Sequence, residues 1–506
     1  MEYGRTVQVQ YKVDGLDSAK VQTPGWYGIP TALVAALAAS LATAVPTLDI
    51  EANEIYDPKT GDKFQIVGVA YQPGGSAGFS KTSPDPLSQP DACLRDAALM
   101  QVMGVNAIRV YNLNPDLNHD ECASIFNAAG MYMILDVNSP LVGEALDSGK
   151  PWETYYMEYL NHTFAIVEAF ANYPNTLLFF SGNEVINDIP SAKFVPQYLR
   201  AVTRDLKNYI KKNLKRQIPV GYSAADVRNV LFDTWNYMQC SDDGKSSDPT
   251  RADAFALNSY SWCGIATTYE SSTFADLTSN FSTSSVPVFF SEYGCIKPAP
   301  RYWNETRAIY GANMTAVFSG GVVYEWTQED NGYGLVSVNG SDLNILGDYN
   351  RLKAAWATID WKTVQSQKAE KKDVSPPKCS TSLLTQKGFD TNFTAPAPPP
   401  GVQKLIDSGI SPKPSGKIVK ISDYNVKLTV KDSEGNTVKD LKVVPLADDE
   451  FNMAGKNSAN TGSTTGSGSN NSTGKNGNGK GDDSSAVLNT PMMLAAIVPL
   501  VALLFV

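Results

Sequence analysis

Eight short apolar segments, each followed by a stretch of helical periodicity, restrict the fold of this chain more than any other feature. They are rich in β-branched and aromatic residues, as is typical of parallel strands buried on both faces. Their spacing of roughly 25–44 residues suits successive strand–helix units. The segments lie at 64–71, 107–113, 132–138, 176–183, 218–223, 254–261, 286–292 and 320–326. Helical patterns between them include 91–103 and 194–212. We therefore predict an α/β protein with a TIM-type (β/α)8 barrel. The alternative is an open doubly wound sheet, which no glycine-rich phosphate loop supports.

Two of these segments are near copies that end in a glutamate. One is aromatic-rich and leads through Ser-Gly-Asn to Glu184, and the other leads through Ser to Glu292. An unpaired carboxylate is costly to bury, so each should face a cavity. Strand ends of a barrel meet at one mouth, where two facing carboxyls can supply the acid and the nucleophile of glycoside chemistry. Asp136 and Glu325 also end strands and form the alternative pair, but neither follows an asparagine as Glu184 does.

The remaining strand ends carry aromatic, amide and charged side chains. They are Tyr71, Gln72, Arg109, Tyr111, Asn112, Asn138, Asn183, Tyr222, Ser223, Asn258, Tyr260, Tyr293, Tyr324 and Trp326. Rings stack on the faces of pyranoses, and amides hydrogen-bond to hydroxyl groups. Around two acids, this set predicts a sugar-binding cleft.

Charge and histidine content exclude other classes of function. The net charge is −10 and the pI is near 4.9, which argues against nucleic acid as a partner. The two histidines, His119 and His162, and the absence of His-x-x-x-His and Cys-x-x-Cys spacings argue against a zinc site or a Ser-His-Asp triad. We predict neither a metal nor another cofactor.

Cysteines and glycosylation sequons indicate a secreted protein. An even number of cysteines favours disulfides over free thiols: Cys93, Cys122, Cys240, Cys263, Cys295 and Cys379. Asn-x-Ser/Thr sequons occur at Asn161, Asn280, Asn304, Asn313, Asn339, Asn392, Asn470 and Asn471. We predict N-glycosylation at the first six of these.

Composition divides the chain into six parts. We assign 1–44 to an N-terminal extension and signal peptide, 45–380 to the barrel, 381–416 to a proline-rich linker, 417–452 to a small β element with a hairpin, 453–485 to a disordered Gly/Ser/Asn-rich tether and 486–506 to a propeptide. The signal assignment rests on an apolar stretch at 29–46 that ends in an Ala-x-Ala pattern.

The chain terminates in an apolar stretch, Met492–Val506. It is shorter than the ~20 residues of a membrane span, and no basic stop follows it. After small residues and a polar spacer, this pattern predicts a glycosylphosphatidylinositol (GPI) attachment signal, cleaved between about 476 and 484. A short transmembrane tail is the alternative.

Four motifs in combination resemble those of fungal cell-wall β-1,3-glucanosyltransferases, glycoside hydrolase family 72. They are Tyr71-Gln-Pro-Gly-Gly, Arg109-Val-Tyr-Asn, Ser181-Gly-Asn-Glu and Ser291-Glu-Tyr-Gly-Cys, and the resemblance covers about 45–380. It implies that Glu184 is the proton donor and Glu292 the nucleophile. It also implies disulfides Cys93–Cys122, Cys240–Cys379 and Cys263–Cys295. The implied substrate-binding residues are Gln72, Tyr111, Asp136, Asn183, Tyr260, Tyr324 and Tyr333. Because no cysteine follows Cys379, the chain resembles the subgroup without a cysteine-rich carbohydrate-binding module.

The resemblance implies a retaining transferase that remodels the fungal cell wall. It would cleave an internal β-1,3-glucan bond, form a covalent glucosyl-enzyme and pass the chain to a second glucan, which makes β-1,3-glucan both donor and acceptor. A GPI lipid would hold the protein at the outer leaflet of the plasma membrane. An endo-β-1,3-glucanase and a non-catalytic glucan-binding wall protein remain alternatives.

Overall fold

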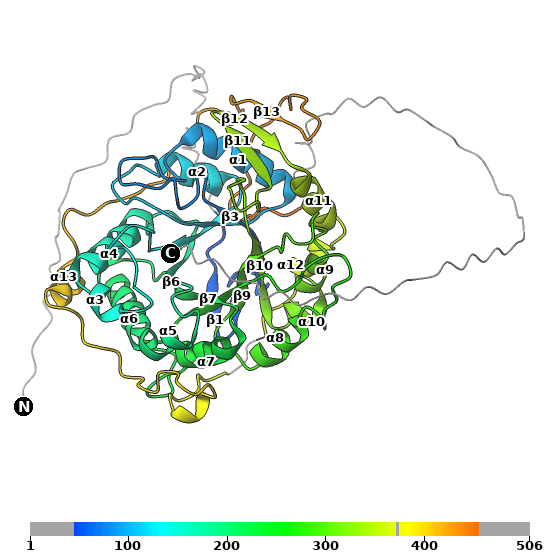
Figure 1. The fold of residues 1–506 in the computed structure, drawn as a ribbon. Coiled ribbons are helices and arrows are strands. Elements are labelled where there is room, and N and C mark those ends of the chain that lie inside the picture. The colour runs from blue at the N-terminus through cyan, green and yellow to red at the C-terminus, as the bar shows by residue number, and fades with distance from the viewer. Residues whose placement is uncertain (1–44, 371–373, 455–506) are drawn as a thin grey trace, which may run out of the picture. The chain divides into compact units, whose positions relative to one another are not determined.

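The computed structural model describes residues 45–370 and 374–454. The predicted signal peptide, the predicted propeptide and nearly all of the predicted tether lie outside these residues, as do the sequons at Asn470 and Asn471. The described chain forms a ring of strands inside a ring of helices (Figure 1).

A closed barrel of parallel strands confirms the predicted architecture and excludes the open sheet. Its strand order is β10-β3-β4-β5-β6-β7-β8-β9. The strands are β3 (Ile66–Tyr71), β4 (Ala107–Val110), β5 (Tyr132–Asp136), β6 (Thr176–Asn183), β7 (Val220–Ala225), β8 (Ala254–Ser259), β9 (Val288–Tyr293) and β10 (Phe318–Val323). Each overlaps one predicted segment, because an uninterrupted apolar run of this length suits a strand that is buried on both faces.

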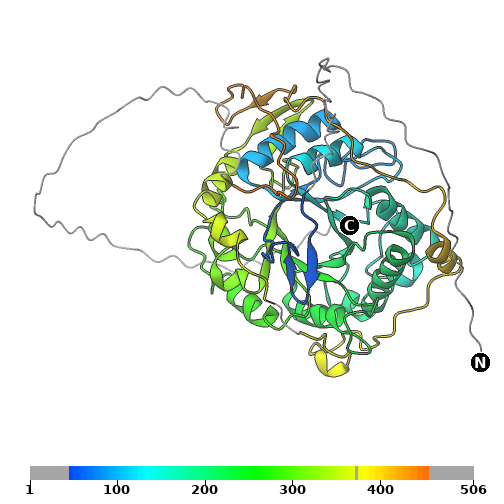
Figure 2. The same ribbon diagram turned by 180° about the vertical axis from the view of Figure 1, so that it is seen from behind.

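Helices surround the barrel, and Figures 1 and 2 show them on its outside. They are α1 (Pro90–Met103), α2 (Asp120–Ala128), α3 (Pro151–Thr154), α4 (Met157–Phe170), α5 (Ile189–Phe194), α6 (Pro196–Asn213), α7 (Arg228–Gln239), α8 (Phe274–Phe281), α9 (Glu305–Ile309), α10 (Ala312–Thr315), α11 (Gly347–Trp356) and α12 (Trp361–Gln365). In α6, Leu199, Val202, Leu206 and Tyr209 recur at helical spacing and are buried. The predicted helices at 91–103 and 194–212 correspond to α1 and α6.

The interior of the barrel is apolar toward the amino ends of the strands and polar at their carboxyl ends. At the boundary between the two parts, Phe180 and Phe289 stack with ring centroids 6.0 Å apart. The guanidinium of Arg109 lies 4.9 Å from the Phe180 ring centroid. The aromatic pair therefore forms the last apolar layer of the barrel interior, and the charged side chains lie next to it toward the carboxyl ends of the strands.

The C-terminal segment, residues 374–454, differs from the predicted linker and separate β element. Its helix α13 (Val402–Ser408) packs on α6 and buries Val402 and Ile406. The short strand β13 (Val430–Lys431) adds to an antiparallel pair, β11 (Val336–Asn339) and β12 (Asp342–Ile345). The predicted hairpin turn forms around 432–436. The whole segment follows the outside of the barrel, because its scattered apolar residues find partners on the helices.

The chain contacts the amino ends of the strands at both ends of its described part. A small hairpin, β1 (Asp49–Glu51) and β2 (Glu54–Tyr56), lies at this end in Figure 2. Phe451 packs edge-on against Phe64, just before β3, with ring centroids 5.1 Å apart. Gly104 has φ +90°, and a Cβ there would lie 2.3 Å from the Ala454 backbone nitrogen, so this close approach requires glycine.

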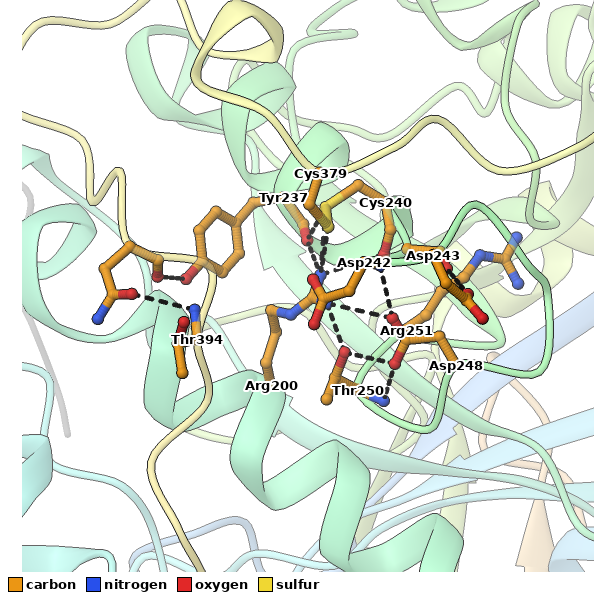
Figure 3. Close-up of polar contacts among 12 residues, drawn as sticks. Arg200, Tyr237, Cys240, Asp242, Asp243, Asp248, Thr250, Arg251, Cys379 and Thr394 are labelled. Atoms are coloured by element: carbon orange, nitrogen blue, oxygen red, sulfur yellow. Dashed lines mark hydrogen bonds and ion pairs between the residues drawn. A yellow bond between two sulfur atoms is a disulfide. The ribbon is translucent and has the colours of Figure 1, made fainter.

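Three disulfides have the pairing that the resemblance implied: Cys93–Cys122, Cys240–Cys379 and Cys263–Cys295. The second fastens the C-terminal segment to the end of α7 (Figure 3). Beside it, fully buried Arg200 donates to the carbonyl oxygens of Tyr237 and Cys240 at 2.8 and 3.1 Å. The same nitrogen of Arg200 lies 3.2 Å from the sulfur of Cys240 and 3.4 Å from that of Cys379.

Candidate active site

Glu184 and Glu292 lie at the carboxyl ends of β6 and β9, as the sequence predicted. Glu184 directly follows β6 and has φ +52°, a left-handed backbone conformation that turns the chain out of the barrel wall. Glu292 lies within β9 opposite Asn258 of β8. The charge of Glu184 contributes to raising the pKa of Glu292, so the two carboxyls interact across the mouth.

Arg109 of β4 is the central cation of the site and is 0% exposed. Its Nε and Nη2 donate to the two carboxylate oxygens of Asp136 at 2.9 and 3.1 Å. Nη2 also donates to Asn183 Oδ1 at 2.8 Å, and Nη1 lies 3.2 Å from Glu292 Oε1. One planar guanidinium thus fixes residues from β4, β5, β6 and β9 relative to each other.

Glu292 accepts hydrogen bonds from three side chains. Besides Arg109, the hydroxyl of Tyr111 donates to Oε1 at 2.8 Å and that of Tyr260 donates to Oε2 at 2.6 Å. Both carboxylate oxygens are therefore bonded, and the orientation of the group is fixed. Hydrogen bonds to a carboxylate favour its ionised form.

Glu184 has weaker support, from one neutral amide. Asn258 Nδ2 donates to Glu184 Oε1 at 3.1 Å. The neighbouring Asn183 uses its Oδ1 to accept from Arg109, Ser223 and Asn258. These donors fix the orientation of the Asn183 amide, so its Nδ2 points away from them.

Burial shapes the protonation of both acids. Desolvation raises the pKa of Glu184, against smaller lowering effects of Asn258 and Arg109. Desolvation likewise raises the pKa of Glu292 to about 7. Arg109 acts to lower this pKa, and repulsion from an ionised Glu184 acts to raise it. That repulsion disappears when Glu184 carries the proton. Because Glu292 has the cation and the two hydroxyls, we infer that the pair shares one proton, held on Glu184.

A group of three tyrosines adjoins Glu292. Tyr260 contacts Tyr324 and Tyr333 at ring-centroid distances of 6.2 and 5.4 Å, and the latter two lie 5.3 Å apart. Tyr333 comes from the loop after β10. Gln72 Nε2 donates to the hydroxyl of Tyr324 at 2.9 Å. We call Tyr260, Tyr324 and Tyr333 the tyrosine wall.

Other predicted strand-end residues lie outside the site. Tyr71, Tyr222, Tyr293 and Trp326 are buried in the apolar layer that contains the helix residues. Tyr71, for example, donates its hydroxyl to Asp96 of α1 at 2.9 Å. Successive side chains of a strand face opposite sides, so half of the residues near each strand end face the helices.

The alternative pair, Asp136 and Glu325, has both members engaged elsewhere. Both oxygens of Asp136 are held by Arg109, and those of Glu325 accept from the amides of Gln72 and Asn331. Sequence reasoning noted Arg109 and Asn258 at strand ends but missed their roles as contacts of the two glutamates. A buried arginine inside an apolar strand was the available signal, since such a charge needs carboxylate partners.

Histidine and acidic residues elsewhere have structural contacts. Nε2 of His119 lies 2.8 Å from Asp85 in the core, and His162 lies beside Glu144. Within 45–370 and 374–454, the His, Cys, Asp and Glu side chains form no group of three that could hold a metal ion. No helix in the described part of the chain has the length and apolar character needed to cross a membrane.

Known proteins are similar to this chain in sequence and in fold. The family model Glyco_hydro_72, described as Glucanosyltransferase, matches residues 37–360. The 1,3-beta-glucanosyltransferase gel2 of Aspergillus fumigatus is 51% identical over 422 residues, covering 83% of this chain and 87% of that protein. The probable 1,3-beta-glucanosyltransferase GAS3 of Saccharomyces cerevisiae is 42% identical over 431 residues, covering 80% and 81%.

Solved structures of Saccharomyces cerevisiae Gas2 have the same fold. One, a variant in complex with laminaritetraose and laminaripentaose, is 32% identical with a TM-score of 0.59, covering 71% of this chain and 75% of that one. Another, in complex with a small compound, is 31% identical with a TM-score of 0.62 and covers 72% and 78%.

Proposed function

Because the chain belongs to glycoside hydrolase family 72, the glucanosyltransferases, we propose that it is a retaining β-1,3-glucanosyltransferase. The observation that carries the proposal is the asymmetry between the two acids. Glu292 accepts from a cation and two hydroxyls, whereas Glu184 accepts from one neutral amide. This asymmetry supports Glu292 as the ionised nucleophile and Glu184 as the protonated acid.

The first half of the reaction uses both carboxyls. Glu292 attacks the anomeric carbon of an internal glucose, and the bond from that carbon to the glycosidic oxygen breaks. Glu184 gives its proton to the departing oxygen. The Nδ2 of Asn183 faces away from its protein partners and can bond the sugar 2-hydroxyl, a contact that strengthens at an oxocarbenium-like transition state.

The second half reverses these roles. A hydroxyl of a second glucan attacks the same carbon, Glu184 takes its proton, and Glu292 leaves. Attack by water instead gives hydrolysis. Gln72, Tyr111 and the tyrosine wall supply rings and amides beside Glu292, which we propose hold the donor and acceptor chains in place. Asp136 acts through Arg109, whose guanidinium it orients.

Product sizing tests this function. The secreted protein is incubated with reduced laminari-oligosaccharides, and the products are separated by mass. We expect products longer than the donor, and we expect Glu184→Gln and Glu292→Gln to abolish them with the fold intact. A matched control, Glu434→Gln in the exposed turn at 432–436, should retain activity.

The same assay separates the alternatives. Shorter products alone indicate an endo-β-1,3-glucanase. Binding of laminari-oligosaccharides without any product indicates a non-catalytic wall protein. Transfer that survives Glu292→Gln contradicts the assignment of the nucleophile.

We also propose that the protein works outside the plasma membrane, attached there by a GPI lipid and N-glycosylated. The disulfides suit an oxidising compartment. The predicted glycosylation sites within the described residues are accessible, with Asn304 partly buried and the other five exposed: Asn161, Asn280, Asn313, Asn339 and Asn392. Mass spectrometry of glycopeptides from the secreted protein tests these sites.

A further inference from the structure

Glu325 is a buried acid that the proposed reaction does not use. It follows Tyr324 at the end of β10 and is 0% exposed. Oε2 accepts from Gln72 Nε2 and Oε1 accepts from Asn331 Nδ2, both at 2.8 Å. Burial raises the pKa of this carboxyl to about 7, against the lowering effects of the Asn331 and Gln72 hydrogen bonds. Burying a carboxylate costs free energy, so a structural or functional role for Glu325 is expected.

Each of the two amides connects Glu325 to one tyrosine of the wall. Gln72 Nε2 also donates to the hydroxyl of Tyr324 at 2.9 Å. Asn331 turns its Oδ1 toward the backbone N–H of Tyr333, which donates to it at 3.1 Å. The carboxylate thereby joins the loop after β3 to the loop after β10.

The tip of the loop that carries Tyr333 lies at the surface. Asp330, Asn331 and Gly332 are exposed. From the far side, Arg301 donates to the carbonyl oxygens of Tyr324 and Tyr333 at 2.8 and 2.6 Å. Backbone bonds also hold the loop, from the Glu325 N–H to Tyr333 O and from the Gly332 N–H to Glu329 O. The Asn331 side chain connects the loop to the Glu325 carboxylate and, through that carboxylate, to Gln72.

We propose that Glu325 is a positioning residue for glucan binding, because its carboxylate joins Gln72 to Asn331 and so sets Tyr324 and Tyr333 in place beside Tyr260. This inference rests on the proposed function. It assigns a role to a residue that does not itself touch the reacting atoms. A glucan ring placed against the wall then meets tyrosines whose positions are already fixed, which reduces the ordering that binding requires.

A charge exchange across the contact tests the role directly. Asn331→Asp keeps the acceptor for the Tyr333 N–H but sets a second carboxylate against Glu325. Adding Glu325→Gln restores the pair, since the new amide donates to the new carboxylate while its oxygen still accepts from Gln72. The matched control is Asp330→Asn, an exposed neighbour in the same loop.

Binding is measured by calorimetry with laminaripentaose at pH 8, where the carboxyls are ionised. All variants carry Glu184→Gln, so the sugar is not consumed. We expect Asn331→Asp to weaken binding about tenfold, the double change Asn331→Asp/Glu325→Gln to return to within about threefold of the parent, and Asp330→Asn to bind as the parent does. In the active enzyme, Asn331→Asp should raise KM by a similar factor and leave kcat nearly unchanged.

The possible outcomes distinguish the positioning role of Glu325 from the proposed function and from a loss of the fold. Equal binding by Asn331→Asp and the parent overturns the positioning role. So does a double variant that binds no better than Asn331→Asp, because a merely structural effect of two changes would accumulate rather than cancel. If the Glu184→Gln parent binds no laminaripentaose, the proposed function fails, and the positioning role fails with it. Thermal unfolding of every variant shows whether a loss comes from the fold instead.

Discussion

The disulfide Cys240–Cys379 should stabilise the described chain more than either of its other two disulfides. The perturbation is the double substitution Cys240→Ala/Cys379→Ala, which removes the bridge without leaving a free thiol. The comparison is Cys263→Ala/Cys295→Ala. The two bridges span 139 and 32 residues of sequence.

The expected difference follows from the length of chain that each bridge closes. In the chain-entropy model, the 139-residue loop corresponds to about 5 kcal/mol and the 32-residue loop to about 3.7 kcal/mol at 25 °C. Loss of the longer bridge also takes two sulfur contacts from Arg200, although the carbonyl oxygens of Tyr237 and Cys240 still accept from it. We therefore expect Cys240→Ala/Cys379→Ala to cost about 5 kcal/mol of unfolding free energy, and the control pair about 1 kcal/mol less.

Urea unfolding measures both costs. The buried tryptophans Trp303, Trp326 and Trp356 report the loss of packing through their fluorescence. Refolding from urea has to retrace the same curve, which establishes that the free energies are equilibrium values. A cost below about 2 kcal/mol for the longer bridge, or a larger cost for the shorter one, would show that loop closure does not govern the stability of this barrel.

Three further predictions concern the site and the anchor. Arg109→Lys keeps the charge but loses the planar fork, so we expect the unfolding free energy to fall by about 3 kcal/mol and transfer to drop at least about 100-fold, measured by urea unfolding and product sizing. An ionised Glu184 would raise the pKa of Glu292, whereas a protonated Glu184 is neutral, as the amide of Glu184→Gln is. The acidic limb of the pH profile, measured with a glucosyl fluoride donor that needs no acid, should therefore stay where it is in the parent; a move of the limb to lower pH contradicts the placement of the shared proton on Glu184. Mature protein from intact cells should lack Met492–Val506 by mass spectrometry, and recovery of that peptide would refute the GPI anchor.

The sequence predicted those parts of the structure that depend on one local pattern. Buried parallel strands are continuous apolar runs, so each strand of the barrel could be located within a few residues, and Glu184 and Glu292 could be placed at strand ends. Contacts between strands were not predictable. Nothing adjacent to Arg109 in the chain indicates that Asp136, Asn183 and Glu292 converge on it. The closure of the barrel brings them together.

The C-terminal segment shows a second limit. Prolines and polar residues at 391–416 have the composition of an extended linker, and the segment is in fact largely without regular structure. Its buried residues, such as Val402 and Ile406, are too few for a periodic pattern. They become core residues only because α6 offers them an apolar surface, and composition carries no information about such a distant partner.

The last described residues lie at the pole of the barrel opposite Glu184 and Glu292. Asn452 Nδ2 donates to the carbonyl oxygens of Gln101 in α1 and of Val105 just before β4, and its N–H donates to Gly130 O just before β5. These contacts lie at the amino ends of the strands. A long glucan can therefore cross the mouth above the two glutamates without meeting this part of the chain.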